Sequence, residues 1–307
     1  MVKMVEAHQQ VMYFNGRMMP HSQAVTELQG RDVQSVGGLY DTERTFNGRL
    51  FKLTEHLERL YRGLEVAGID AGMSLEVMET ASQDVLEANR PMLGTDREFT
   101  VTQIVSLSRS GTPDAQRGVN VAIYCQPLDY SEFAEGYSNG VRLVTPVTYN
   151  VPELDEQLRG KQGFRRVVPL LTNAEGDITE CSGANFMFVR DGRIKLPDRS
   201  NVLPGISMQT VLELADAAGI SVDEDDYSTY HAYLADEAFI SRTRYCILPV
   251  ETINGVLLSD SLPGPVTTKL IDGWRNMVGV DFVRQALDCV PPENGDANPD
   301  RERLLSG

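Results

Sequence analysis

The chain has 307 residues, of which 41% are hydrophobic and 23% are charged, a globular composition with enough residues for two domains. Its formal net charge is −16, from 44 acidic and 28 basic residues, and this excess disfavours nucleic acid and anionic membranes as partners. The longest apolar runs, such as residues 119–125, are far shorter than the roughly 20 residues of a membrane-spanning helix. Residues 1–10 also lack the apolar core of a signal peptide, so we expect a cytoplasmic protein.

The cysteines and histidines offer no pattern for a metal site. The four cysteines are widely separated, no Cys-x-x-Cys pair occurs, and the four histidines are equally scattered. Three of the cysteines lie in or beside apolar, strand-like runs, which predicts small buried thiols at Cys125, Cys181 and Cys246. We therefore expect no metal ion in this protein.

The first predicted elements are a hairpin and a helix. Residues 40–46 and 49–53 flank Asn47-Gly48, a dipeptide typical of a two-residue turn between antiparallel strands. A helix is expected from about Thr54, which is a suitable N-cap residue. One apolar face of this helix is formed by Leu57, Leu60, Tyr61 and Leu64.

A second helix and two strands complete the first predicted domain. Ser74 begins the helix, and Pro91 limits it. Residues 99–108 and 119–126 are typical of strands, with a polar loop between them. This order of elements indicates an α+β domain of residues 1–135.

A linker at residues 136–140, within the sequence EGYSNG, is expected to lead into a larger second domain of residues 141–290. Strands are predicted there at residues 141–144, 167–171, 184–189, 238–240 and 246–250, and helices at residues 207–218 and 266–278. Residues 291–307 are polar and rich in proline, with little to bury, so we expect a disordered tail.

One segment of the second domain has an unusual combination of features. Residues 176–207 contain two tight turns, a carboxylate at Glu180 between small polar residues, and a Leu-Pro-Gly-Ile-Ser step into a helix. This block resembles that of the class IV (fold type IV) pyridoxal-phosphate aminotransferases, which include branched-chain and D-amino-acid aminotransferases and aminodeoxychorismate lyase. The resemblance continues through residues 56–69, 235–255 and 263–274 in the same order, so it spans nearly the whole chain.

The resemblance implies a binding site for the cofactor's phosphate group. Backbone amides at the helix start, at Gly205, Ile206 and Ser207, would bind the phosphate, as the positive end of a helix dipole favours anions. Thr243 matches the phosphate-binding threonine of the family. Arg59 matches its phosphate-binding arginine, whose guanidinium fork fits phosphate oxygens.

The resemblance also assigns a partner to the pyridine ring of the cofactor. Glu180 matches the family's glutamate that faces the pyridine nitrogen. A carboxylate in that place keeps the nitrogen protonated and makes the ring an effective electron sink. His56, one helical turn before Arg59, is expected to be a hydrogen-bonded structural residue.

The Schiff-base lysine of the family is harder to place in this chain. In the family it precedes a helix that carries a tyrosine. Lys161 is the only lysine in the corresponding interval, 19 residues before Glu180, and only residues 162–166 separate it from the next predicted strand. Five residues form little more than one helical turn of about 3.6 residues, so the usual helix cannot be present. No tyrosine follows Lys161 before Glu180.

Two interpretations follow from this short segment. In the first, the connection is trimmed and Lys161 remains the catalytic residue. In the second, the protein is a degenerate homologue without the catalytic lysine, which binds a phosphorylated ligand or acts without pyridoxal phosphate. Lys161 would then be an exposed basic residue.

Substrate contacts are predicted at Tyr40, Arg109 and Arg244. Arg242 and Arg244 flank Thr243, where relatives usually have small residues or proline. Such cations could bind a substrate carboxylate or narrow the pocket. Arg109 lies in a loop that approaches the active site in this family's fold, although solvated arginines would explain the same pattern.

The resemblance as a whole implies a two-domain α+β protein of the fold type IV aminotransferase class. It implies transfer of an amino group between an amino acid, or an amine, and a 2-keto acid through pyridoxal phosphate. A homodimer is expected, because the family tends to form dimers. Since the same fold also hosts a lyase, the reaction does not follow from the fold alone.

Overall fold

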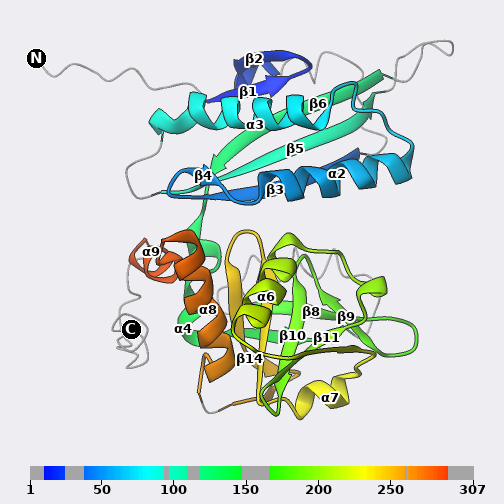
Figure 1. Cartoon of the computed structure of the whole chain (residues 1–307), viewed down its shortest axis with the longest axis vertical. Coiled ribbons are helices and arrows are strands. Elements are labelled where there is room, and N and C mark those ends of the chain that lie inside the picture. The colour runs from blue at the N-terminus through cyan, green and yellow to red at the C-terminus, as the bar shows by residue number, and fades with distance from the viewer. Residues whose placement is uncertain are drawn as a thin grey trace, which may run out of the picture. The chain divides into compact units, whose positions relative to one another are not determined.

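A computed structural model describes residues 10–24, 38–92, 97–108, 118–146, 166–259 and 261–289 (Figure 1). The chain divides into two compact units, residues 1–128 and 129–307, which are described separately below. No helix in the described ranges is long and apolar enough to cross a membrane. The predicted tail at residues 291–307 lies outside the described residues.

The first unit is an antiparallel sheet packed against two helices. Its described residues form six strands in the order β2-β1-β6-β5-β3-β4. The strands are β1 (Val11–Phe14), β2 (Arg17–Pro20), β3 (Gly38–Phe46), β4 (Arg49–Leu50), β5 (Phe99–Ser108) and β6 (Gly118–Pro127). The predicted hairpin at Asn47-Gly48 is confirmed as the turn between β3 and β4.

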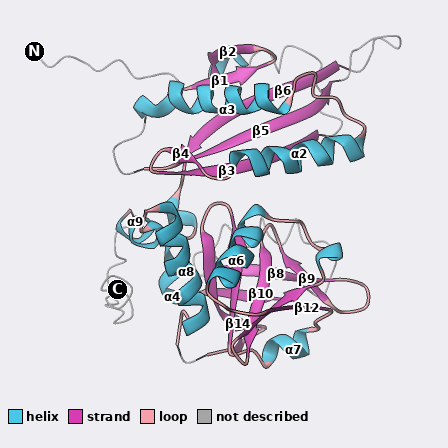
Figure 2. Ribbon diagram, in the orientation of Figure 1, coloured by secondary structure: helices cyan, strands magenta, loops and turns pink. Residues whose placement is uncertain are grey.

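Helices α2 (Leu53–Ala67) and α3 (Leu75–Asn89) lie against this sheet (Figure 2). The core includes Leu57 and Leu64 from α2, Val85 from α3 and Ile123 from β6, each almost inaccessible to solvent. Ser74 caps α3, as predicted, because its side chain accepts a hydrogen bond from the Val77 amide.

The expected cap of α2 is wrong. The helix begins at Leu53, and its N-cap is Lys52 in the left-handed conformation, without a side-chain cap. The Thr54 hydroxyl instead donates to the Glu79 carboxylate on α3, at 3.0 Å. The Thr54 side chain, which was expected to cap α2, therefore makes a tertiary contact with α3 instead.

The second unit is built on a mixed sheet. Its described strands follow the order β12-β11-β10-β13-β14-β7-β8-β9, and β15 pairs with β14. Because β9 also contacts β10, the sheet curls back on itself. The strands are β7 (Val141–Val144), β8 (Val167–Thr172), β9 (Ile178–Cys181), β10 (Asn185–Arg190), β11 (Arg193–Pro197), β12 (Val222–Asp225), β13 (Glu237–Arg242), β14 (Cys246–Ile253) and β15 (Val256–Leu257).

Helices of the second unit cover this sheet. Helix α6 (Ile206–Ala217) packs on β13 and on α8 (Pro265–Val278), and α4 (Ala134–Asn139) packs on α9 (Phe282–Asp288) and β14. A short helix, α7 (Thr229–Tyr233), precedes β13. Cys125 in the first unit and Cys181 and Cys246 in the second are buried thiols, as predicted.

The segment expected to be a linker has a different structure. Residues 134–139 form α4, and the division between the two units falls after Leu128 rather than at residues 136–140. Tyr137 is only 1% exposed, and its hydroxyl donates to the Tyr245 carbonyl oxygen. The glycine, serine and asparagine around it suggested a linker, but burial of this aromatic ring stabilises the helix.

Candidate functional site

The start of α6 is held close to β10 by a glycine. Gly205 is the N-cap of the helix, and it has no side chain that could cap the first turn. A Cβ atom at this position would lie 2.1 Å from Asn185 Oδ1, so any other residue would displace the Asn185 side chain. Ile206 and Ser207, the first two helical residues, are both buried. The helix thus presents uncapped backbone amides, with the positive end of its dipole, next to β10.

Gly205→Ala is expected to lower the free energy of unfolding by about 1–3 kcal/mol, because the new methyl group overlaps Asn185. Chemical denaturation of the purified variant measures this. Gly63→Ala in α2 is the control: its Cβ would meet only the flexible end of Leu39, at 3.3 Å. We expect that control to change stability by less than about 1 kcal/mol. Equal effects of the two substitutions would contradict the close approach at Gly205.

Glu180 is tied to the same helix start. Its carboxylate accepts a hydrogen bond from the Leu203 amide at 3.1 Å and one from Asn185 Nδ2 at 3.5 Å. Asn185 also donates to the Leu203 carbonyl oxygen at 2.9 Å. Burial raises the pKa of Glu180, and the Leu203 amide partly opposes that rise. The structure therefore brings Glu180 together with Gly205, two predicted site residues that are far apart along the motif.

A cavity of about 340 Å³ lies in the second unit, beside the turn that follows Glu180. Ser182 from this turn lines it, as do Arg242 and Arg244 on either side of Thr243. Part of the wall is apolar and includes Val141. The predicted residues Glu180 and Thr243 thus each lie within two residues of a side chain that lines this cavity.

Two of the three arginines in this cavity are paired with carboxylates. Arg244 forms an ion pair with Glu132, another lining residue. Arg166 lies 3.0 Å from a Glu135 oxygen and 3.3 Å from a Glu251 oxygen. The sequence had indicated neither Glu132 nor Arg166, because their partners are distant along the chain. Arg244, predicted to contact substrate, is held by Glu132 instead of being a lone cation.

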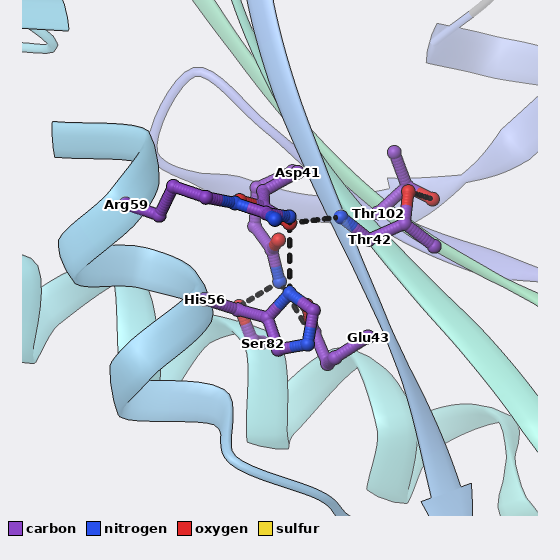
Figure 3. A network of polar contacts seen from close by, with 8 residues as sticks. Asp41, Thr42, Glu43, His56, Arg59, Ser82 and Thr102 are labelled. Atoms are coloured by element: carbon purple, nitrogen blue, oxygen red, sulfur yellow. Dashed lines mark hydrogen bonds and ion pairs between the residues drawn. The ribbon is translucent and has the colours of Figure 1, made fainter. Parts of the chain in front are cut away.

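Two predicted site residues of the first unit lie within the described residues, Arg59 and Tyr40, and their environments differ. Tyr40 on β3 is 72% exposed. Arg59 on α2 binds Asp41, with Nε 2.8 Å and Nη2 2.6 Å from the two carboxylate oxygens (Figure 3). His56 Nδ1 lies 2.8 Å from the same carboxylate, so His56 is the hydrogen-bonded residue that was expected. The structure thus adds a buried partner, Asp41, that the family pattern did not suggest.

The environment of Asp41 fixes its charge. Burial by itself would raise its pKa, but the bonds from His56 and Arg59 hold the pKa below its usual value. Burial also lowers the pKa of His56, although the hydrogen bond with Asp41 opposes that change. Asp41 is therefore ionised at neutral pH, and Arg59 neutralises it. Whether Arg59 also contributes to a phosphate site stays a prediction.

The remaining predicted residues, Lys161 and Arg109, lie outside the described residues. The structure describes three other lysines, and each has a role or partner outside the cavity. Lys195 lies 2.5 Å from an Asp223 oxygen, Lys269 donates to the Ala218 carbonyl oxygen, and Lys52 is the N-cap of α2. None of the described side chains lining the cavity is a lysine.

Known proteins resemble this chain over most of its length. The family model for amino-transferase class IV matches residues 38–253. A D-alanine aminotransferase of Bacillus licheniformis is 25% identical over 285 residues, which cover 86% of this chain and 96% of that protein. One of Listeria innocua is 28% identical over 266 residues, which cover 83% of this chain and 92% of that protein. The solved branched-chain amino acid aminotransferase of Escherichia coli has the same fold, with a TM-score of 0.74 at 23% identity, and covers 89% of this chain and 94% of that one. The chain belongs to the class IV aminotransferase family and has the fold type IV architecture.

Proposed function

We propose that this protein is a transaminase that uses pyridoxal phosphate to move an amino group between an amino acid and a 2-keto acid. Membership of the class IV family supports this reaction class. The observation that carries the proposal is the attachment of the Glu180 carboxylate to the loop that leads into α6, through Leu203 and Asn185. The start of α6 suits the phosphate group of the cofactor, and Glu180 suits its ring nitrogen.

The described residues fit pyridoxal phosphate at its phosphate group and at its ring nitrogen. The uncapped amides at Ile206 and Ser207 suit the phosphate, since a helix N-terminus binds anions. Gly205 keeps that helix start free of a side chain that would fill the space beside Asn185. The carboxylate of Glu180 suits a protonated pyridine nitrogen. Thr243 and Arg59 are proposed as further phosphate ligands from the family resemblance.

When bound, pyridoxal phosphate supplies an electron sink for the carbanion that forms at the substrate Cα atom. Glu180 would hold a proton on the ring nitrogen and so maintain that property. Lys161 is the proposed residue that attaches the cofactor and moves the proton at Cα, as general base and acid. Assembly into a homodimer and location in the cytoplasm remain predictions from the family and the sequence.

An absorption spectrum of the purified protein with added pyridoxal phosphate tests the proposal. We expect a visible band that borohydride removes, together with measurable amino transfer from an amino acid to a 2-keto acid. A protein that gives no such band and no transfer would instead be the degenerate homologue. Binding of inorganic phosphate or pyridoxal phosphate without covalent attachment would support that alternative.

A further inference from the structure

A cluster of charged and titratable side chains lies where α2 packs on β3 in the first unit, and it contains Asp41, Glu43, His56 and Arg59 (Figure 3). The first three are buried, whereas the Arg59 side chain is 17% exposed. Both His56 and Arg59 bind the Asp41 carboxylate. Arg59 therefore connects a buried carboxylate to the surface of the first unit, where solvent reaches the guanidinium.

Arg59 uses only part of its guanidinium to bind Asp41. Nε and Nη2 lie 2.8 and 2.6 Å from the two Asp41 oxygens. A guanidinium has five N–H donors on three nitrogens, so Nη1 takes no part in this pair. The delocalised charge of arginine allows one side chain to bind two anions at once. A second anion at Arg59 would meet a cation that Asp41 already balances, so any further negative charge nearby would oppose its binding.

Glu43 is a source of such a negative charge. It lies two residues after Asp41 on β3, so both side chains are on the buried face of the strand. Gln103 on β5 donates to one Glu43 oxygen, and no described residue donates to the other. Burial, together with the charge of Asp41, raises the pKa of Glu43 to about 8, and the charge of Arg59 opposes that rise. The charges of Glu43 and Arg59 are therefore coupled.

The other groups around Glu43 keep their charge near pH 8. His56 on α2 has a lowered pKa and is neutral there, and Asp41 has a lowered pKa and is ionised. From α3 and β5, Ser82 and Gln103 contribute uncharged groups. Below pH 8 the charges of Asp41 and Arg59 balance each other. Above it the ionised carboxylate of Glu43 gives the cluster an excess negative charge.

We propose that Glu43 is a proton switch for anion binding at Arg59: a phosphate or sulfate group binds there when Glu43 is protonated and binds more weakly when Glu43 is ionised. This inference rests on the proposed role of Arg59 as a phosphate ligand and adds its regulation by pH. The coupling is reciprocal, so an anion at Arg59 favours the protonated form of Glu43. Binding of the anion should therefore take up protons near pH 8.

The test uses sulfate, whose own charge does not change between pH 6.5 and pH 9. Binding is followed by carbon-13 NMR of the Arg59 Cζ atom, whose signal is assigned by its absence from Arg59→Lys. In the wild-type protein the dissociation constant is expected to rise by about 10-fold from pH 6.5 to pH 9, because a nearby buried negative charge repels the anion. In Glu43→Gln, which cannot ionise, it should change by less than about 2-fold.

Glu58→Gln is the matched control, because Glu58 is next to Arg59 on α2 but has a 54% exposed side chain. It should keep the pH dependence of the wild-type protein. Proton uptake is a second measurement, made at pH 8 in weakly buffered solution with sulfate or with sodium chloride of equal ionic strength. Sulfate should cause more uptake than chloride in the wild-type protein, a comparison that decides the question even if Glu43→Gln does not fold.

Two results would overturn the inference: a wild-type sulfate affinity that is equal at pH 6.5 and pH 9, and an equal pH dependence in the wild-type protein and Glu43→Gln. An Arg59 signal that does not respond to sulfate at pH 6.5 would also overturn it, because Arg59 would then not be an anion site. None of these measurements requires bound pyridoxal phosphate. A missing visible band contradicts the transaminase proposal alone, and a visible band with no effect of pH on sulfate binding contradicts only the role of Glu43.

Discussion

Replacement of Lys161 by alanine is expected to reduce the turnover number for amino transfer by about 10²- to 10⁴-fold, the usual contribution of a general acid-base residue. The chain has five lysines, and Lys161 is the only one between β7 and Glu180. Lys52, Lys195 and Lys269 are placed elsewhere, as described above. The expected loss follows because one residue would both attach the cofactor and move the proton at the substrate Cα atom.

Two measurements check this expectation. The turnover number of Lys161→Ala is compared with that of Lys269→Ala, whose lysine donates to the Ala218 carbonyl oxygen on the surface of the second unit. Mass spectrometry after borohydride reduction with pyridoxal phosphate then identifies the attached lysine. A stoichiometric adduct on Lys161 would contradict the degenerate interpretation. An unmodified Lys161 in a protein that turns over neither amino acids nor amines would contradict the transaminase proposal.

Turns between adjacent strands were predictable from dipeptides. Asn47-Gly48 was identified, and the same rule applies to three further turns at Asn15-Gly16, Asp191-Gly192 and Asn254-Gly255. In all four turns both residues have positive φ angles, the geometry of a two-residue hairpin turn. The strands β1, β2, β11 and β15 could therefore have been predicted from the sequence. Their apolar runs alone are too short to indicate strands.

The part of the site on the second unit was predictable because its residues lie in one continuous motif. Glu180, Asn185 and Gly205 occur within residues 176–207, and the structure connects them through Leu203. The ion pairs around the cavity were not predictable. Arg244 and Glu132 are 112 residues apart, so their pairing depends on the fold. The residues next to Thr243 therefore do not indicate that Arg244 has a carboxylate partner.

The first unit shows where a local rule fails. Along β3, alternation would bury Tyr40 and expose the charged residues Asp41 and Glu43. The structure has the opposite arrangement, with Tyr40 72% exposed, Asp41 3% exposed and Glu43 fully buried. Such conflicts between pattern and burial are expected at functional sites. Because Asp41 points into the unit, it is the carboxylate partner of Arg59, and the same arrangement buries a second acidic residue.

That second residue, Glu43, makes the stability of the protein depend on pH. Its carboxyl accepts a hydrogen bond from Gln103 at 2.7 Å, and its other oxygen has no hydrogen-bond partner among the described residues. Burial, with a smaller contribution from the negative charge of Asp41, raises the pKa of Glu43 from 4.5 to about 8. Glu43 is therefore protonated in the folded protein at neutral pH but ionised in the unfolded chain.

The sign of the pH dependence follows from proton binding. Between pH 4.5 and about 8 the folded state holds a proton at Glu43 that the unfolded state has released. The contribution of Glu43 to the free energy of unfolding is therefore fully present below pH 4.5, falls as the pH rises, and is lost above pH 8. The total loss is on the order of 5 kcal/mol, from the rise of the pKa from 4.5 to about 8 at about 1.4 kcal/mol per pKa unit. Asp41 and His56 have lowered pKa values and act in the opposite sense, with stability lost as the pH falls.

Comparison of the wild-type protein with Glu43→Gln isolates this contribution, because Asp41 and His56 are present in both. Glutamine has nearly the shape of a protonated glutamic acid but cannot ionise, so the two proteins should have similar free energies of unfolding near pH 5. By pH 9 the variant should be more stable by several kcal/mol, measured by urea denaturation at each pH. Glu58→Gln is the control, because Glu58 lies on α2 with a 54% exposed side chain, and its difference from wild type should change little with pH. A difference between wild type and Glu43→Gln that is constant from pH 5 to pH 9 would mean that Glu43 is ionised in the folded protein. A further cation or solvent would then have to reach its second oxygen.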